Sequence, residues 1–143
     1  MIDQSRINAE RSVFALNRVP ASIYRFEGIG TGHPRLLMAA RTNRHNIYTL
    51  QIDLDEFPFS VPKVFVRRML LTRDGKPMNG ASAAMHTLTS EHGWTRICHY
   101  GWDSWNPGVT LYKIYVKCRL WLEAYEGHIA TGRPLDHWLN HQA

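Results

Sequence analysis

The chain has no long hydrophobic run. Among its 143 residues, no apolar stretch approaches the roughly 20 residues that a membrane-spanning helix needs. The N-terminal segment MIDQSRINAERSVF contains acidic residues and lacks the apolar core of a secretory signal. We therefore expect a cytoplasmic protein with no membrane partner.

Cysteine is scarce as well. Two cysteines in a chain of this length do not suggest a disulfide framework. The sequence also lacks a G-x-S-x-G nucleophile elbow, a phosphate-binding GxxxxGK loop and a zinc-binding HExxH motif. These absences leave no motif for a serine hydrolase, a P-loop nucleotide-binding protein or an HExxH metalloprotease.

Charge of neither sign is concentrated in a run. The net charge of +5 comes from 17 basic and 12 acidic residues, and the basic residues are scattered. Such a surface favours solubility and mild affinity for polyanions, and it would help to dock an acidic protein partner. The hypothesis that the chain binds nucleic acid depends only on its charge and on scattered aromatic residues, so nucleic acid is not the partner we expect.

The pattern of apolar residues predicts one α+β domain over residues 1–143. A helix is expected from Ser5 to Arg18, with Ser5 as the candidate N-cap and Pro20 preventing its continuation. The strand-like runs that follow are Ser22–Phe26, Arg35–Arg41, Ile47–Leu54 and Lys63–Arg67. Because short links join these runs, we predict a four-stranded antiparallel meander.

A second helix is predicted from Thr110 to Glu126. Thr110 is the expected N-cap, and Gly127 and Gly132 are stop signals. The apolar stripe of this helix consists of Leu111, Ile114, Tyr115, Cys118, Trp121, Leu122 and Tyr125. The tail, Leu135–Leu139, is expected to form one short turn of helix.

The two cysteines differ in their surroundings. Cys118 lies on the apolar stripe, where a cysteine acts as a small, inert hydrophobe. Cys98 follows residues 70–95, whose weak periodicity and turn dipeptides predict a long loop, and it stands between Arg96 and His99. A nearby cation favours the reactive thiolate. From the residues alone, a reactive thiol and a cysteine that merely packs against tryptophan are about equally supported.

A zinc site is a third interpretation of this segment. His86, His92, Cys98 and His99 lie within one stretch, but their spacing is not that of the paired ligands in structural zinc sites. Adjacent residues such as Cys98 and His99 also have difficulty reaching one ion from an extended backbone. We therefore expect no metal.

Two segments together resemble the ubiquitin-conjugating enzyme family. EFPFSVPKVFV at residues 56–66 resembles the aromatic-Pro-Phe step and the Pro-Lys-Val that lead into the fourth strand of that family. RIC at 96–98, WNP at 105–107 and TL at 110–111 resemble its active-site cysteine, its Trp-x-Pro element and the start of its next helix. The resemblance covers about residues 6–126, and the few residues beyond the last helix resemble the compact bacterial relatives found in anti-phage defence operons.

The resemblance implies a role for each matching residue within a single ubiquitin-conjugating-enzyme-like domain. Cys98 would be the nucleophile that forms a thioester. Trp105 and Pro107 would support the active-site loop. Pro58 and Pro62 would fix the turn before the fourth strand.

The sequence departs from the family pattern after His86. This residue takes the place of the histidine in the family's His-Pro-Asn element, but Thr87 and Leu88 replace the proline and the asparagine. The missing asparagine is linked to oxyanion stabilisation or to the structure of the active-site loop. The candidates for supporting roles are therefore His86, Thr87, His99, Asn106 and backbone N–H groups, although a solvent-facing His99 without a role is equally well supported.

The function that the resemblance implies is that of an acyl carrier. Cys98 would accept an activated protein C-terminus as a thioester and transfer it to an amine, usually a lysine of an acceptor protein. The implied partners are an activating enzyme, which uses the ATP, and a donor that is either a ubiquitin-like protein or the C-terminus of a cyclic-nucleotide-producing nucleotidyltransferase. No cofactor is needed. The alternative is a non-catalytic protein-binding module on the same fold.

Overall fold

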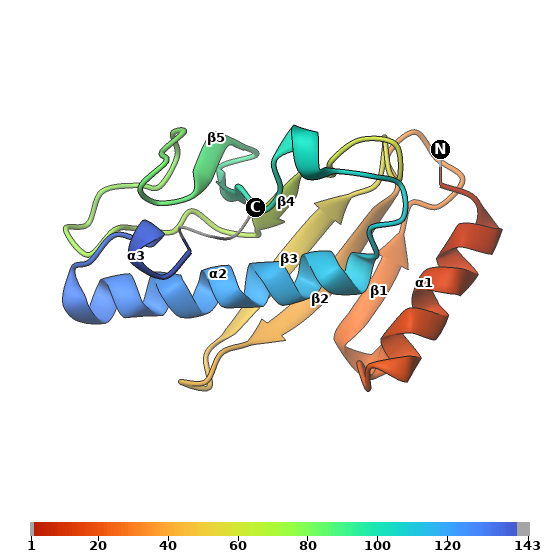
Figure 1. Cartoon of the computed structure of the whole chain (residues 1–143), viewed down its shortest axis with the longest axis horizontal. Coiled ribbons are helices and arrows are strands. Elements are labelled where there is room, and N and C mark those ends of the chain that lie inside the picture. The colour runs from red at the N-terminus through yellow and green to blue at the C-terminus, as the bar shows by residue number, and fades with distance from the viewer. Residues whose placement is uncertain (1, 140–143) are drawn as a thin grey trace.

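The computed structural model describes residues 2–139 and has the predicted α+β architecture (Figure 1). In chain order, its elements are α1 (Gln4–Leu16), η1 (Ala21–Ile23), β1 (Tyr24–Glu27), β2 (Arg35–Arg41), β3 (Ile47–Asp53), β4 (Val64–Val66), β5 (Thr87–Glu91), β6 (Trp94–Ile97), η2 (Trp102–Ser104), α2 (Leu111–Thr131) and α3 (Asp136–Leu139). α2 lies across one face of the sheet, α1 lies beside β1, and α3 lies against the C-terminal part of α2 (Figure 1).

The sheet has two more strands than the predicted meander. Within residues 2–139 it is six-stranded and antiparallel, in the order β1-β2-β3-β4-β6-β5. β5 and β6 form a hairpin inside the segment predicted as a loop, and β6 pairs with β4. Its turn is His92-Gly93, with φ values of 60° and 73°, as a two-residue type I′ turn requires. The prediction of four strands and a long loop was therefore wrong, and Cys98 directly follows a strand.

The first four strands lie close to their predicted positions. β2 has the predicted bounds, β3 ends one residue early and β4 is shorter at both ends. The first run differs because Ile23 N donates to the carbonyl of Pro20 at 3.2 Å, which makes Ala21–Ile23 a 3-10 turn and delays β1 to Tyr24. The apolar residues that alternate along the third run are buried: Tyr48, Leu50, Ile52 and Leu54.

α1 begins earlier than predicted. Oδ1 of Asp3 accepts the N–H of Arg6 at 2.8 Å, so Asp3 is the N-cap and the prediction of Ser5 was wrong. The helix also ends at Leu16 rather than at Arg18, because Arg18 has a left-handed φ of 61°. Its buried residues are Ile7, Glu10 and Phe14.

α2 confirms the predicted cap and stripe but not the predicted end. Oγ1 of Thr110 accepts the N–H of Lys113 at 3.1 Å, and all the residues predicted for the apolar stripe are buried. The helix passes through Gly127 and ends before Gly132, whose φ is 80°. A Cβ at position 127 would lie 2.8 Å from the ring of Trp138, so Gly127 makes room for α3 instead of ending the helix.

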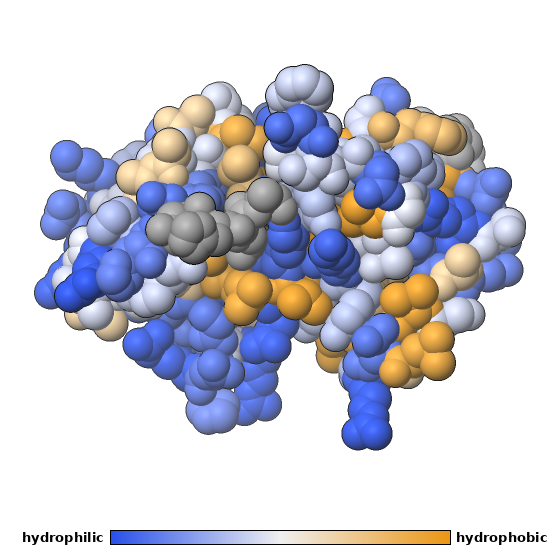
Figure 2. Space-filling view, in the orientation of Figure 1, coloured by the Kyte–Doolittle hydropathy of each residue, from blue (hydrophilic) through white to orange (hydrophobic). Residues whose placement is uncertain are grey.

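The hydrophobic core lies between α2 and the sheet. Large side chains such as Trp121, Leu50 and Ile52 are fully buried there, and burial of each stabilises the fold by roughly 1.5–3 kcal/mol. The outer surface on the side of α2 is mostly hydrophilic, and its apolar areas form separate patches over α2 and next to α1 (Figure 2). None of the helices in the described chain is both long and apolar enough to cross a bilayer.

Candidate active site around Cys98

The open end of the β5–β6 hairpin fixes the backbone of Cys98. Ile97, the last residue of β6, pairs with Thr87, the first residue of β5. One residue further along, the N–H of Cys98 donates to the carbonyl of His86 at 2.9 Å. Nε1 of Trp121 on α2 donates to the same carbonyl at 2.9 Å. The half-buried cysteine is therefore tied to both the sheet and the helix beneath it.

Cys98 opens onto a groove of about 630 Å³. The groove is lined by Ala81, Ser82, Ala83, His86, Thr87, Leu88, Cys98, His99, Tyr100, Gly101, Asp103, Ser104 and Asp136. It brings together four of the candidate residues from the sequence, namely Cys98, His86, Thr87 and His99. Asn106 is not part of its lining.

The structure adds Asp136 to this site. Its Oδ1 lies 2.7 Å from Nε2 of His86, and it is the first residue of α3. The side chain of His86 is largely covered, whereas that of Asp136 is half exposed. The sequence contains no local signal for this contact, because it depends on how α2 returns the chain to the hairpin.

His99 is buried rather than solvent-facing. Only 4% of its surface is exposed, and Nε2 lies 2.9 Å from the carbonyl of Pro62. Burial lowers the pKa of His99 to about 4, and the nearby charges of Lys117 and Arg96 act in the same direction. The imidazole is therefore neutral at pH 7, donates to Pro62 and is a weak base, which does not favour a supporting role in deprotonating a thiol or an amine.

The side chains of Thr87 and Asn106 are engaged elsewhere. Oγ1 of Thr87 donates to the carbonyl of Gly80 at 2.8 Å, and Thr87 is buried. Oδ1 of Asn106 accepts the N–H of Gly108 at 2.8 Å. Neither geometry favours the expected donation of a hydrogen bond to an oxyanion; both side chains stabilise loops in this conformation.

The segment after Cys98 is held against the loop of Pro58 and Pro62. Nε1 of Trp105 donates to the carbonyl of Pro58 at 2.9 Å, and its ring packs edge-on against Tyr100, with the ring centroids 5.5 Å apart. The hydrogen bond of His99 to Pro62 is the second connection. The two prolines that the sequence singled out thus supply the carbonyls to which the loop is attached.

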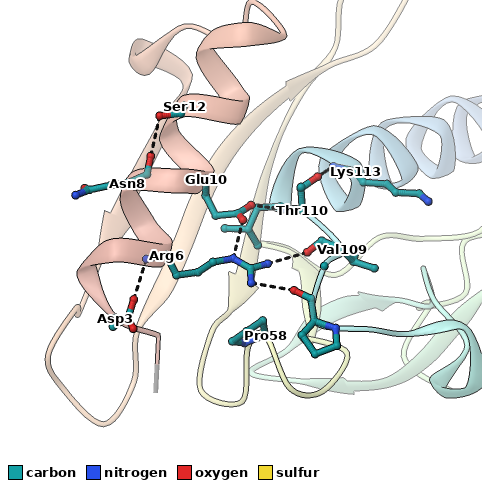
Figure 3. Close-up of polar contacts among 12 residues, drawn as sticks. Asp3, Arg6, Asn8, Glu10, Ser12, Pro58, Val109, Thr110 and Lys113 are labelled. Atoms are coloured by element: carbon teal, nitrogen blue, oxygen red, sulfur yellow. Dashed lines mark hydrogen bonds and ion pairs between the residues drawn. The ribbon is translucent and has the colours of Figure 1, made fainter.

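α1 holds the other end of this loop, as Figure 3 shows. The guanidinium of Arg6 donates to the carbonyls of Pro107 and Val109, at 2.8 and 3.1 Å, and pairs with Oε2 of Glu10 at 2.8 Å. Oε1 of the buried Glu10 accepts the N–H of Leu111 at 2.6 Å. A carboxylate at the N-terminus of α2 is favourable because the helix dipole is positive there. Arg6 and Glu10 therefore fix where the loop ends and α2 begins.

Lys117 on α2 places a positive charge near the cysteine. Its Nζ donates to the carbonyl of His99 at 3.1 Å and lies 3.8 Å from the ring centroid of Tyr100. Burial lowers the pKa of Lys117, as does the charge of Lys113, while the electrostatic interaction with Cys98 acts in the opposite direction. No pattern in the sequence marks Lys117, which lies on the flank of the apolar stripe.

Cys118 has the inert character that its position predicted. It is fully buried, and burial raises the pKa of its thiol far above the ordinary value. Within residues 2–139, no group of three or more His, Cys, Asp or Glu side chains is arranged to hold a metal ion.

Comparison with known proteins gives no match: no model of a protein family, no curated protein and no solved structure is significantly similar to this chain. The function is therefore inferred from the residues around Cys98 and from their geometry.

Proposed function

We propose that this chain is a cytoplasmic acyl carrier of the ubiquitin-conjugating type. It accepts an activated protein C-terminus as a thioester on Cys98 and transfers it to an amine. The observation that carries the proposal is the placement of Cys98: a half-buried cysteine on a fixed backbone, in a groove that His86 also lines. Cys118, in contrast, has no access to solvent.

The order of the elements supports a ubiquitin-conjugating-enzyme-like fold. A helix precedes an antiparallel meander, the cysteine follows a strand, and the Trp-x-Pro segment leads into a helix that crosses the sheet. The side chain and the carbonyl of that segment, at Trp105 and Pro107, both anchor the loop. These contacts support the role that the resemblance implies for Trp105 and Pro107.

The chemistry follows from a nucleophilic thiol. Sulfur of Cys98 attacks the carbonyl carbon of the thioester between the donor and the activating enzyme, and the thiol of the activating enzyme leaves; an amine later attacks the new thioester and releases Cys98. Each tetrahedral intermediate carries a negative oxygen that needs positive charge or hydrogen-bond donors. The ammonium of Lys117, which interacts electrostatically with Cys98, supplies such a charge.

The partners belong to the same proposal. An activating enzyme uses ATP and hands over the acyl group. The donor is a ubiquitin-like protein or the C-terminus of a cyclic-nucleotide-producing nucleotidyltransferase, and the acceptor is a lysine-bearing protein. A setting in bacterial antiviral defence fits either donor.

A non-reducing gel tests the proposal. The chain is incubated with ATP and with the activating enzyme and carboxylate donor encoded by neighbouring genes. We expect an adduct that thiol reductants cleave and that does not form in Cys98→Ala. Cys118→Ala is the matched control and should keep the adduct.

The alternative, a non-catalytic protein-binding module, predicts a different result. The chain would then bind the donor without a thiol-sensitive adduct, and Cys98→Ala would bind it equally well. An adduct that survives Cys98→Ala would instead show that the site has been assigned to the wrong residue.

A further inference from the structure

His86 lies between Cys98 and Asp136. Its carbonyl accepts the N–H of Cys98 at 2.9 Å, so the two residues face each other at the open end of the β5–β6 hairpin. Nε2 of its imidazole lies 2.7 Å from Oδ1 of Asp136. All three residues line the same groove. His86 therefore contacts the main chain of Cys98 through its carbonyl and a carboxylate of α3 through its imidazole.

The contact with Asp136 determines the tautomer of neutral His86. An ionised carboxylate has no hydrogen to donate, so Nε2 carries the hydrogen of this bond. The other nitrogen, Nδ1, then holds a lone pair. Nδ1 is bonded to Cγ and is the ring nitrogen closer to the main chain, which is paired with the main chain of Cys98. The basic nitrogen is thus the one not bonded to Asp136, on a residue that lines the same groove as Cys98.

We propose that Asp136 is a positioning residue that holds His86 in this tautomer, and that Nδ1 of His86 is the base for the thiol of Cys98. The role in acyl transfer rests on the proposed function. The S–H bond of Cys98 breaks as its proton moves to Nδ1, and a C–S bond forms between Cys98 and the donor carbonyl. The C–S bond of the donor then breaks, and the departing thiolate takes the proton from His86.

The proposed proton transfer requires a side-chain rotation that brings Sγ of Cys98 to Nδ1 of His86. In the described chain, no hydrogen bond joins Sγ of Cys98 to the ring of His86. Catalytic hydrogen bonds are often long before a substrate binds and shorten in the complex. Cys98 is half-buried on a groove, which leaves space for such a rotation.

A purely structural role does not account for the contact between His86 and Asp136. α3 is attached by other means, because the backbone N–H of Asp136 donates to the carbonyl of Ala84 at 2.8 Å and both Leu135 and Leu139 are buried. Ion pairs with a half-exposed partner contribute little to stability. The contact adds little to the attachment of α3, whereas it fixes the ring of His86.

Other ionisable groups must be separated from Asp136 in any test. Cys98, His99 and Asp103 line the same groove, and Lys117 on α2 interacts electrostatically with Cys98. Asp103 lines the same groove but makes no hydrogen bond or ion pair with His86 among residues 2–139. It therefore offers a matched control for the loss of one negative charge.

¹⁵N NMR of the full chain at pH 8 reads the tautomer of a histidine ring directly. The ring of His86, assigned with a His86→Gln sample, is expected to have a protonated Nε2 and a bare Nδ1. In Asp136→Asn the new amide can donate to Nε2, so the form protonated at Nδ1 should become substantially populated. A protonated Nδ1 in the wild type, or an unchanged ring in Asp136→Asn, would overturn the inference.

The rate at which iodoacetamide alkylates Cys98 at pH 7 tests the role as a base. Asp136→Asn and His86→Gln should each slow the reaction roughly tenfold. Asp136→Glu, which keeps the carboxylate, should retain most of the rate, and Asp103→Asn should react like the wild type. Equal slowing by Asp103→Asn, or no slowing by Asp136→Asn, would contradict the inference.

Both measurements work without an acyl donor. If Asp136→Asn does not fold, as judged by circular dichroism, the wild-type spectrum and the rate of Asp136→Glu still decide. If Nδ1 is bare and the alkylation rates are as expected but no thioester forms, the proposed function is wrong and the role of His86 and Asp136 stands. If a thioester forms but Nδ1 is protonated, the proposed function stands and the role of His86 and Asp136 is wrong.

Discussion

Protonation of His99 should destabilise the fold in mildly acidic solution. Nε2–H donates to Pro62, so a second proton must go to Nδ1, which is buried and has no partner in the described chain. The pKa of His99 in the folded state is about 4, against an ordinary value of 6.5. The unfolded chain therefore binds the extra proton between these values, and stability falls as the pH drops through this window.

The size of the effect follows from the two pKa values. A gap of about 2.5 between them corresponds to roughly 3 kcal/mol when the window is crossed completely. Between pH 7 and pH 5, the expected loss is about 2 kcal/mol, because only part of the window is crossed. Other carboxyl and histidine groups titrate in the same range, so the contribution of His99 must be measured as a difference.

The assay is urea denaturation of the wild type and of His99→Gln at several pH values from 7.5 to about 4.5. Glutamine keeps an N–H donor for Pro62 but cannot be protonated. The free energy of unfolding of the wild type should fall about 2 kcal/mol further than that of His99→Gln between pH 7 and pH 5. His137→Gln, on the exposed surface of α3, is the control and should follow the wild type. Parallel pH profiles for the wild type and His99→Gln would refute the reasoning.

Further predictions concern stability. Glu10→Ala leaves the N–H of Leu111 without its buried acceptor and should lower the free energy of unfolding in urea by about 2–4 kcal/mol, whereas Glu10→Gln should lose about half as much; equal losses would contradict a role for the charge. Gly127→Ala should displace the ring of Trp138, seen as a change in tryptophan fluorescence, because the new Cβ would lie 2.8 Å from it; an unchanged spectrum would contradict this. Cys118→Ser should lower the melting temperature more than Cys118→Ala, because it buries a hydroxyl in an apolar stripe; the reverse order would argue against that burial.

Local patterns made most of the fold predictable. The alternation in β3 and the helical stripe of α2 each depend on residues close in sequence, and Thr110 caps its own helix. The β5–β6 hairpin was missed because β5, with the sequence TLTSE, is polar and carries an irregularity between Leu88 and Glu91. Its turn, His92-Gly93, lacks the usual Asn-Gly or Asp-Gly signal.

The site was predictable only where a motif marks it. The resemblance pointed to Cys98 and His86 as candidate residues, and the structure brings them to one groove. Asp136 and Lys117 were missed because their contacts depend on the course of α2 across the sheet, which no short pattern specifies. The burial of His99 was missed for the same reason: Pro62 is far away in the sequence.

Replacing the sulfur of Cys98 by an oxygen gives the most direct test of whether this residue accepts the acyl group, because the acyl bond then changes from a thioester to an oxygen ester. The chain is charged with donor, activating enzyme and ATP, and its intact mass is measured with and without a thiol reductant. We predict an added mass equal to that of the donor less one water, which the reductant removes from the wild type and from Cys118→Ala. In Cys98→Ser the same added mass should resist the reductant and yield to mild alkali, because an oxygen ester replaces the thioester. A reductant-sensitive adduct in Cys98→Ser, or no adduct on the wild type, would contradict the account.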